Sequence, residues 1–116
     1  MKPKKLAIIC FKGLESFLDW ADHIEEYEVK KFIVTRQDQI DGAIDWADIV
    51  FIEWMNELAV YVSNYRNIVF KDKVIVRCHS YEILNGYANQ INWENIDHVI
   101  FIANHVKDTF ERIKAV

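Results

Sequence analysis

Five short apolar runs, each rich in β-branched or aromatic residues, recur along the chain with longer amphipathic segments between them. Inside each run the apolar residues follow one another without alternating polar positions. That pattern is typical of a strand buried on both faces of a sheet. We predict strands near residues 5–10, 31–35, 48–53, 73–78 and 98–103.

The segments that follow the runs have helical periodicity. In the first of them Leu14, Leu18 and Ala21 fall on one side, as expected of a helix that packs on a sheet. Corresponding stripes predict helices over residues 14–24, 40–47, 58–65, 84–91 and 106–113. The expected start signals are a capping box at Thr35-x-x-Asp38 and N-caps at Asn56 and Asn104.

A strand–helix order repeated five times predicts a parallel sheet, because parallel neighbours need long and almost always right-handed crossovers. We therefore predict one α/β domain over residues 1–116: a three-layer, doubly wound, Rossmann-like sheet of about five βα units. A closed eight-stranded barrel is excluded, since it needs about 250 residues.

Composition and charge exclude further classes of protein. Hydrophobic residues make up 52% of the chain, which excludes a disordered protein, and a net charge of −4 argues against nucleic acid as a partner. The apolar runs are far shorter than the roughly 20 residues that span a bilayer, and no signal peptide is seen. We expect a cytoplasmic protein without a transmembrane segment, although peripheral membrane contact remains possible.

Cysteine and histidine usage indicates no metal centre. Cys10 and Cys78 each lie within or beside an apolar run, so we expect both to be buried and reduced. No Cys-x₂-Cys or His-x₃-His spacing is present, and we predict neither a metal nor another cofactor.

Polar residues gather directly after the predicted strands, where the carboxyl ends of a parallel sheet bind ligands. The topology brings Lys12, Glu53, Arg77, His79, Glu82 and Asn104 to one edge. A histidine such as His79 could bond a sugar hydroxyl or be oriented by a carboxylate, but a structural histidine is an equal alternative. The other candidates also have structural alternatives. Gly13 could be needed only for a tight turn, and Trp54 could be an ordinary packing residue. Glu53 could be an acid in a first helical turn that interacts favourably with the helix dipole.

Several fingerprints of other parallel-sheet proteins are absent from the sequence. There is no G-x-G-x-x-G after the first run, no P-loop and no G-x-S-x-G elbow. The turn after the first run also lacks the paired acids of a phospho-receiver.

Three stretches, at residues 47–54, 74–82 and 91–104, together resemble the N-terminal domain of a GT-B glycosyltransferase. The first reads ADIVFIEW, the second is a strand that ends in Arg-Cys-His, and the third contains Asp-His-Val-Ile-Phe-Ile-Ala before a helix start. The retaining, family-four-like group is the nearest match.

The resemblance implies a function and roles for particular residues. The full-length enzyme would transfer a sugar from a nucleotide-sugar donor to the hydroxyl of a sugar or lipid-linked acceptor. The implied catalytic residue is His79, and Lys12 and Gly13 would approach the donor diphosphate. Acceptor-binding roles fall on Glu53, Trp54, Asn56, Glu82 and Asn104.

The same resemblance implies that this chain is a truncated, acceptor-side half. The C-terminal donor domain, with its E-x₇-E signature, is absent, so the fragment is expected to be inactive alone. The alternative is a standalone flavodoxin- or receiver-like module that binds a ligand or partner without catalysis.

Overall fold

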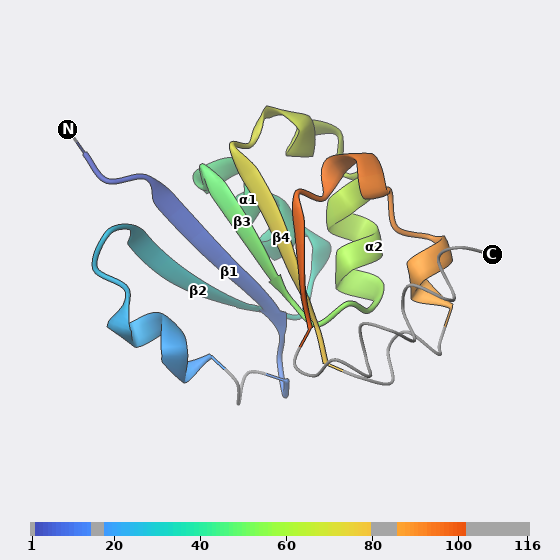
Figure 1. The fold of residues 1–116 in the computed structure, drawn as a ribbon, viewed down its shortest axis with the longest axis horizontal. Helices are drawn as coiled ribbons and strands as arrows, with labels where there is room; N and C mark the ends of the chain where they lie inside the picture. The colour runs from blue at the N-terminus through green and yellow to red at the C-terminus, as the bar shows by residue number, and fades with distance from the viewer. Residues whose placement is uncertain (1, 15–17, 80–85, 102–116) are drawn as a thin grey trace.

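The computed structural model describes residues 2–14, 18–79 and 86–101 and shows a five-stranded sheet in which all strands run parallel (Figure 1). The strands are β1 (Lys5–Phe11), β2 (Glu28–Val34), β3 (Ile49–Glu53), β4 (Lys73–Cys78) and β5 (His98–Phe101). Their order across the sheet is β2-β1-β3-β4-β5. The predicted α/β, Rossmann-like arrangement with a parallel sheet is therefore confirmed.

The strands inside the sheet agree best with the sequence prediction. The bounds of β1, β3 and β4 lie within one residue of the predicted ones, and β5 begins at the predicted His98. The prediction that every strand is buried on both faces is wrong for β2 and β5. In β2 the first half is polar, with Glu28, Lys30 and Lys31 exposed, because this strand pairs only with β1.

Two α-helices within the described residues, α1 (Gln37–Trp46) and α2 (Glu57–Asn64), cover one face of the sheet (Figure 1). Their buried side chains pack against the apolar side chains of the inner strands. From α1 these are Ile40, Ala43 and Ile44, and from α2 they are Leu58, Ala59 and Val62. Neither helix is long and apolar enough to cross a lipid bilayer, nor is any other helix in the described part of the chain.

The opposite face of the sheet is covered differently from the prediction. Instead of a helix over residues 14–24, the described part of that range contains the 3₁₀ segment η2 (Asp19–His23). Its packing residues Leu18 and Ala21 are three positions apart, the repeat of a 3₁₀ turn, so a single turn buries both. Together with the strands they form a second core cluster on this face.

The predicted helix over residues 84–91 is also wrong in its described part. Gly86 has a φ of 81°, a left-handed conformation that interrupts a right-handed helix, and only the short η5 (Tyr87–Asn89) follows it. Further 3₁₀ segments are η3 (Arg66–Phe70), before β4, and η6 (Trp93–Asn95), before β5. The predicted helix over residues 106–113 lies outside the described residues.

The helix starts correct one prediction and confirm another. At α1 the cap is formed by Gln39 instead of Asp38, since Gln39 Oε1 accepts hydrogen bonds from the backbone N–H groups of Thr35 and Arg36 at 2.7 and 3.1 Å. At α2 the predicted N-cap is present: Asn56 Oδ1 accepts from the N–H of Leu58 at 3.0 Å. The N-cap predicted at Asn104 falls outside the described residues.

The two cysteines confirm the prediction of buried thiols that are not joined by a disulfide. Cys10 lies in the core cluster under η2, and Cys78 lies in the cluster under α1 and α2, so the sheet itself separates them. Both side chains are fully buried.

We expect neither thiol to react rapidly with an aromatic disulfide reagent in the native protein, because the reagent must reach the sulfur and both sulfurs lie in the core. In denaturant both thiols should react rapidly, because unfolding exposes both sulfurs to the reagent. Rapid labelling of Cys10 or Cys78 without denaturant would contradict the packing described here.

Candidate functional site

The strand order creates one natural crevice at the carboxyl edge of the sheet. After β1 the chain crosses to β2 on one side, and after β2 it returns to β3 on the other side of β1. The loops that leave β1 and β3 therefore diverge, and such a switch point is where open parallel sheets bind ligands. The candidate residues Lys12, Gly13, Glu53, Trp54 and Asn56 all lie in or beside these two loops.

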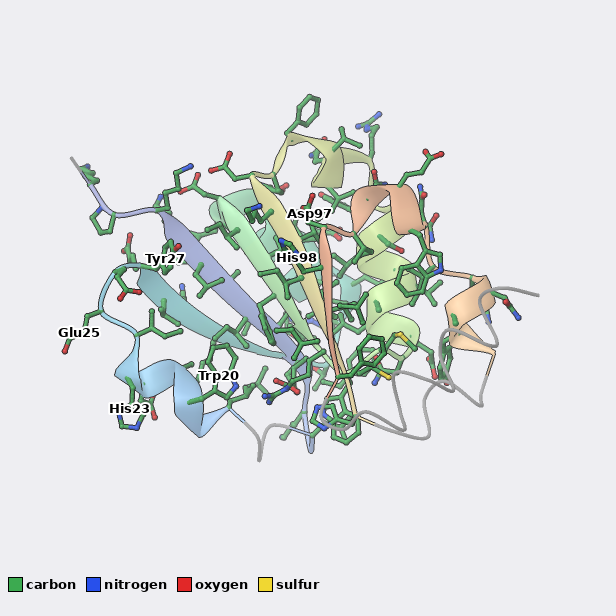
Figure 2. The ribbon with its side chains drawn as sticks, viewed as in Figure 1. Trp20, His23, Glu25, Tyr27, Asp97 and His98 are labelled. Atoms are coloured by element: carbon green, nitrogen blue, oxygen red, sulfur yellow. The ribbon has the colours of Figure 1, made fainter. Side chains whose placement is uncertain are left out.

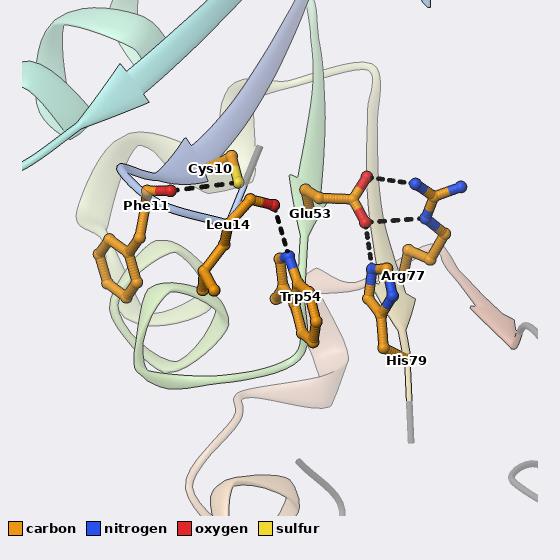
Figure 3. A network of polar contacts seen from close by, with 7 residues as sticks. All are labelled: Cys10, Phe11, Leu14, Glu53, Trp54, Arg77 and His79. Carbon is orange, nitrogen blue, oxygen red and sulfur yellow. Dashed lines mark hydrogen bonds and ion pairs between the residues drawn. The ribbon is translucent and has the colours of Figure 1, made fainter. Parts of the chain in front are cut away.

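A buried ionic cluster stands beside this crevice (Figure 3). Glu53, the last residue of β3, lies opposite Arg77 of β4 in the parallel register. Arg77 donates two hydrogen bonds to the carboxylate, from Nε to Oε1 at 2.8 Å and from Nη2 to Oε2 at 2.7 Å. His79 Nε2 is in short hydrogen-bond contact with the same Oε1. Glu53 is 0% and His79 3% exposed, whereas the Arg77 side chain is 18% exposed, so the carboxylate and the imidazole are enclosed and the guanidinium is partly open to solvent.

The contacts of Glu53 fix the orientation and proton position of His79. An ionised carboxylate can only accept hydrogen bonds, so the imidazole Nε2 must carry the proton that joins the two groups. Arg77 in turn holds the carboxylate plane through its two parallel bonds. The imidazole is thus oriented by Glu53, and Glu53 by Arg77.

Trp54 connects this cluster to the loop after β1. Its ring stacks on the imidazole of His79, with centroids 3.7 Å apart and planes inclined by 16°. Its indole Nε1 donates to the carbonyl oxygen of Leu14 at 3.0 Å. The backbone of Trp54 has a φ of 82°, which for a bulky residue costs on the order of 1–3 kcal/mol. Both contacts keep the residue in that conformation.

Arg77 is also covered on its far side by an aromatic residue. The guanidinium carbon lies 5.7 Å from the ring centre of Trp20, within the range of a cation–π contact. Trp20 projects from η2 over the sheet, and its ring centre lies 4.9 Å from that of Phe51 (Figure 2). Its Nε1 is buried without a hydrogen-bond partner among the described residues.

Sequence reasoning placed Arg77 at the correct edge but gave it no role, and it missed Trp20. The signal for Arg77 was present, since an acid ends one inner strand and a base stands near the end of the next. Trp20 could not be found in this way, because residues 14–24 are predicted as a helix whose apolar stripe does not include it, whereas the structure has η2 in the described part of that range.

The structure brings Glu53, Trp54 and His79 into contact, as three of the candidate site residues. Sequence reasoning expected Glu53 and His79 to open onto one cleft, and the structure instead encloses both. Asn56 is used as the N-cap of α2. The candidates Glu82 and Asn104 lie outside the described residues.

Lys12 and Gly13 form the turn after β1. The N–H of Lys12 continues the β1–β2 ladder by donating to the Val34 carbonyl at 3.1 Å, and its side chain is exposed. Gly13 has a φ of 96°, and the N–H of Leu14 closes the turn on the Phe11 carbonyl at 3.1 Å. A Cβ at Gly13 would meet nothing within 4 Å, so the glycine is required by its backbone conformation and not by lack of space.

Within the described ranges no group of three or more His, Cys, Asp or Glu side chains is arranged to hold a metal ion. The acid of the buried cluster is instead neutralised by Arg77. Its chemistry is therefore that of an oriented imidazole beside a guanidinium–carboxylate pair.

Comparison of the chain with protein-family models, curated proteins and solved structures finds no significant match. The likeness to glycosyltransferases accordingly rests on the three sequence stretches alone.

We expect Arg77→Met to destabilise the fold by about 3 kcal/mol, because it leaves the Glu53 carboxylate buried without its main counter-charge. The double variant Arg77→Met with Glu53→Gln should recover part of that loss, since it removes the unpaired charge. Chemical denaturation followed by circular dichroism measures both.

The matched control is Lys31→Met, which breaks the solvent-exposed pair between Lys31 and Asp22 at 2.8 Å. Exposed pairs contribute little, so this variant should unfold close to the wild type. An equal loss of unfolding free energy in Arg77→Met and Lys31→Met would show that burying the Glu53 carboxylate without Arg77 has no electrostatic cost.

For Asn56 we expect a cap effect that depends on the side-chain oxygen. Asn56→Ala should lose about 1 kcal/mol of stability, while Asn56→Ser, which keeps an acceptor for the Leu58 N–H, should lose little. Urea titrations measure the difference. Equal stability of the two variants would mean that the Asn56–Leu58 bond does not stabilise α2.

Proposed function

We propose that this chain is the acceptor-side domain of a glycosyltransferase, which transfers a sugar from a nucleotide-sugar donor to an acceptor hydroxyl. One observation carries the proposal. Two of the three stretches that resemble such enzymes, residues 47–54 and 74–82, contribute the side chains that touch one another at the carboxyl edge. Stretches that are distant in sequence thus converge on one cluster, as parts of a shared site would.

In this proposal the members of the cluster have different roles, which their contacts support. Both carboxylate oxygens of Glu53 are occupied, by Arg77 and His79, and the side chain is fully buried. Glu53 is therefore a positioning residue that acts through His79, in place of the direct acceptor contact expected from sequence. We assign His79 to the acceptor hydroxyl, in an orientation fixed by Glu53 and by the Trp54 stack. Since His79 is 3% exposed, this assignment requires that acceptor binding uncovers the imidazole.

Sugar transfer builds positive charge on the sugar and negative charge on the leaving diphosphate, and both must be stabilised from two sides of a cleft. The cluster supplies an oriented imidazole on one side. Lys12, exposed in the turn after β1, is the residue that would approach the diphosphate. The isolated domain should bind an acceptor saccharide but not turn over.

One observation favours the alternative of a standalone binding module. The strand order β2-β1-β3-β4-β5 is the flavodoxin-like order, whose ligands bind between the first and third strands. This is an analogy of fold, and fold alone does not determine function. Phosphorylation of the receiver type at the end of β3 is disfavoured. The carboxylate at that position, Glu53, is fully buried and accepts two hydrogen bonds from Arg77.

The test uses the chain labelled with ¹⁵N, with the indole N–H of Trp54 as a reporter of the cluster. We expect acceptor-type saccharides to shift this signal with millimolar affinity, and His79→Gln to weaken binding at least fivefold, since glutamine cannot reproduce the imidazole. His98→Gln, at an exposed position of β5, is the matched control and should bind like the wild type.

Two results would count against the proposal. One is saccharide binding that is equally strong in His79→Gln and His98→Gln. The other is a chain that binds flavin mononucleotide but no saccharide, which would support the module. Product formation by the isolated chain from a nucleotide sugar and an acceptor would overturn the division of labour between two domains.

A further inference from the structure

A hollow opens at the carboxyl edge, on the face of the sheet that carries the helices. Its volume is about 270 Å³, and it lies between the end of β1 and the first turns of α1 and α2. The buried ionic cluster is on the opposite face, because Glu53 and Arg77 point toward η2 whereas Phe11 points toward α1 and α2. The hollow is therefore distinct from the Glu53–His79 site.

The floor of the hollow is apolar and partly aromatic. It is formed by Ile40, which belongs to the core cluster on this face, and by Phe11 and Tyr61, which are partly buried and pack against that cluster. The Tyr61 hydroxyl donates to Asp41 Oδ1 at 2.6 Å, which fixes the ring. This hydrogen bond, together with desolvation, raises the pKa of Tyr61 to about 12, so the hydroxyl stays protonated and uncharged at neutral pH.

The rim of the hollow is polar and carries both signs of charge. It includes Arg36 and Gln37 at the start of α1 and Glu57 in the first turn of α2. Arg36 is paired with Asp38, with Nε 2.9 Å from Oδ1. Glu57 Oε1 accepts a hydrogen bond from the Tyr87 hydroxyl at 3.1 Å. Arg36 is the guanidinium among the lining residues, and Asp38, which is not one of them, already neutralises it. Since Glu57 adds a negative charge, the rim does not favour an anionic ligand.

The hollow and the ionic cluster share the same two loops. Phe11 directly precedes the turn whose Leu14 carbonyl binds Trp54, and Glu57 follows the Asn56 cap of the loop that begins at Trp54. The two sites thus flank the crevice between β1 and β3 from opposite faces. One elongated ligand lying in that crevice could contact both.

We propose that this hollow binds one uncharged pyranose ring of a saccharide acceptor whose reacting hydroxyl is presented to the cluster of Glu53 and His79. The inference rests on the proposed function and adds a substrate class to it. An aromatic and apolar floor suits the C–H face of a sugar, and planar amide, guanidinium and carboxylate groups suit its hydroxyls. Only a small ligand fits so limited a volume, and a single ring meets that limit.

The test measures binding of methyl glycosides of glucose, galactose, mannose and N-acetylglucosamine to the ¹⁵N-labelled chain by chemical-shift titration. We expect at least one to bind with millimolar affinity and to shift signals of Phe11, Arg36 and Tyr61. Its uronic-acid counterpart should bind at least fivefold more weakly, because Asp38 already neutralises Arg36 and the Glu57 carboxylate repels a second anion. Absence of binding by all four at about 50 mM, or equal binding of the uronic acid, overturns the inference.

Two substitutions locate the binding, each with a matched control. Phe11→Leu keeps an apolar side chain but removes the aromatic face, and Glu57→Gln keeps the shape but removes the charge. Each should weaken binding at least threefold. Phe70→Leu, at a residue that is 78% exposed outside the hollow, and Glu94→Gln on η6 should leave the affinity unchanged.

The outcomes separate this inference from the proposed function. Binding that is weakened by His79→Gln but not by Phe11→Leu or Glu57→Gln would overturn the sugar-ring hollow and leave the proposed function standing. Binding that is weakened by Phe11→Leu and Glu57→Gln but not by His79→Gln would place a saccharide in the hollow and remove His79 from its recognition.

Discussion

The paired hydrogen bonds between Arg77 and Glu53 are the interaction on which the carboxyl edge depends. A carboxylate at the end of an inner strand is removed from water by the folding of the sheet, at a cost of several kcal/mol unless it is compensated. Compensation comes from the residue directly opposite in the neighbouring strand, so the register between β3 and β4 is itself part of the site. Once Glu53 is held, His79 has a defined orientation. The Trp54 ring can then stack on it, and the Trp54 indole ties the loop after β3 to the loop after β1.

The alternation of side chains along parallel strands gives the two faces of this edge different chemistry. Glu53 and Arg77 point to the face of the sheet on which Trp20 of η2 packs. Phe11 points to the opposite face, where α1 and α2 begin. One side of the crevice is consequently an enclosed ionic cluster, and the other is an open, partly aromatic hollow. No separate insertion is needed to create both. The alternation of side chains along each strand and the reversal of the strand order at β1 produce them.

The parts of the fold that could be predicted from sequence are those determined by burial in the sheet. β1, β3 and β4 were predictable because strands covered on both faces become continuous apolar runs. The polar half of β2 was not predictable from such a run, because an edge strand leaves residues such as Lys30 exposed. The stripe over residues 14–24 correctly indicated that Leu18 and Ala21 are buried, but these two residues fit a 3₁₀ turn as well as a helix. In the site, topology was enough to bring Glu53 and His79 to one edge. Their enclosure depends on tertiary packing by Trp54, which the sequence pattern does not encode.

Departures from ordinary local structure concentrate around this edge. A tryptophan adopts a positive φ, an acid is fully buried, and the nearby indole N–H of Trp20 lacks a hydrogen-bond partner among the described residues. Ionic pairs elsewhere, such as Lys4 with Asp72 near the amino end, are exposed and require no such arrangement. A buried ion pair is seldom more stabilising than a well-packed apolar pair of similar volume, so stability alone does not explain Glu53 and Arg77. We infer that strain and buried polarity, which occur together at the edge where open parallel sheets bind ligands, reflect a requirement for an imidazole in one fixed orientation. The apolar core of the inner strands offsets the free energy lost by burying the cluster. The same core maintains the register between β3 and β4 that places Glu53 opposite Arg77.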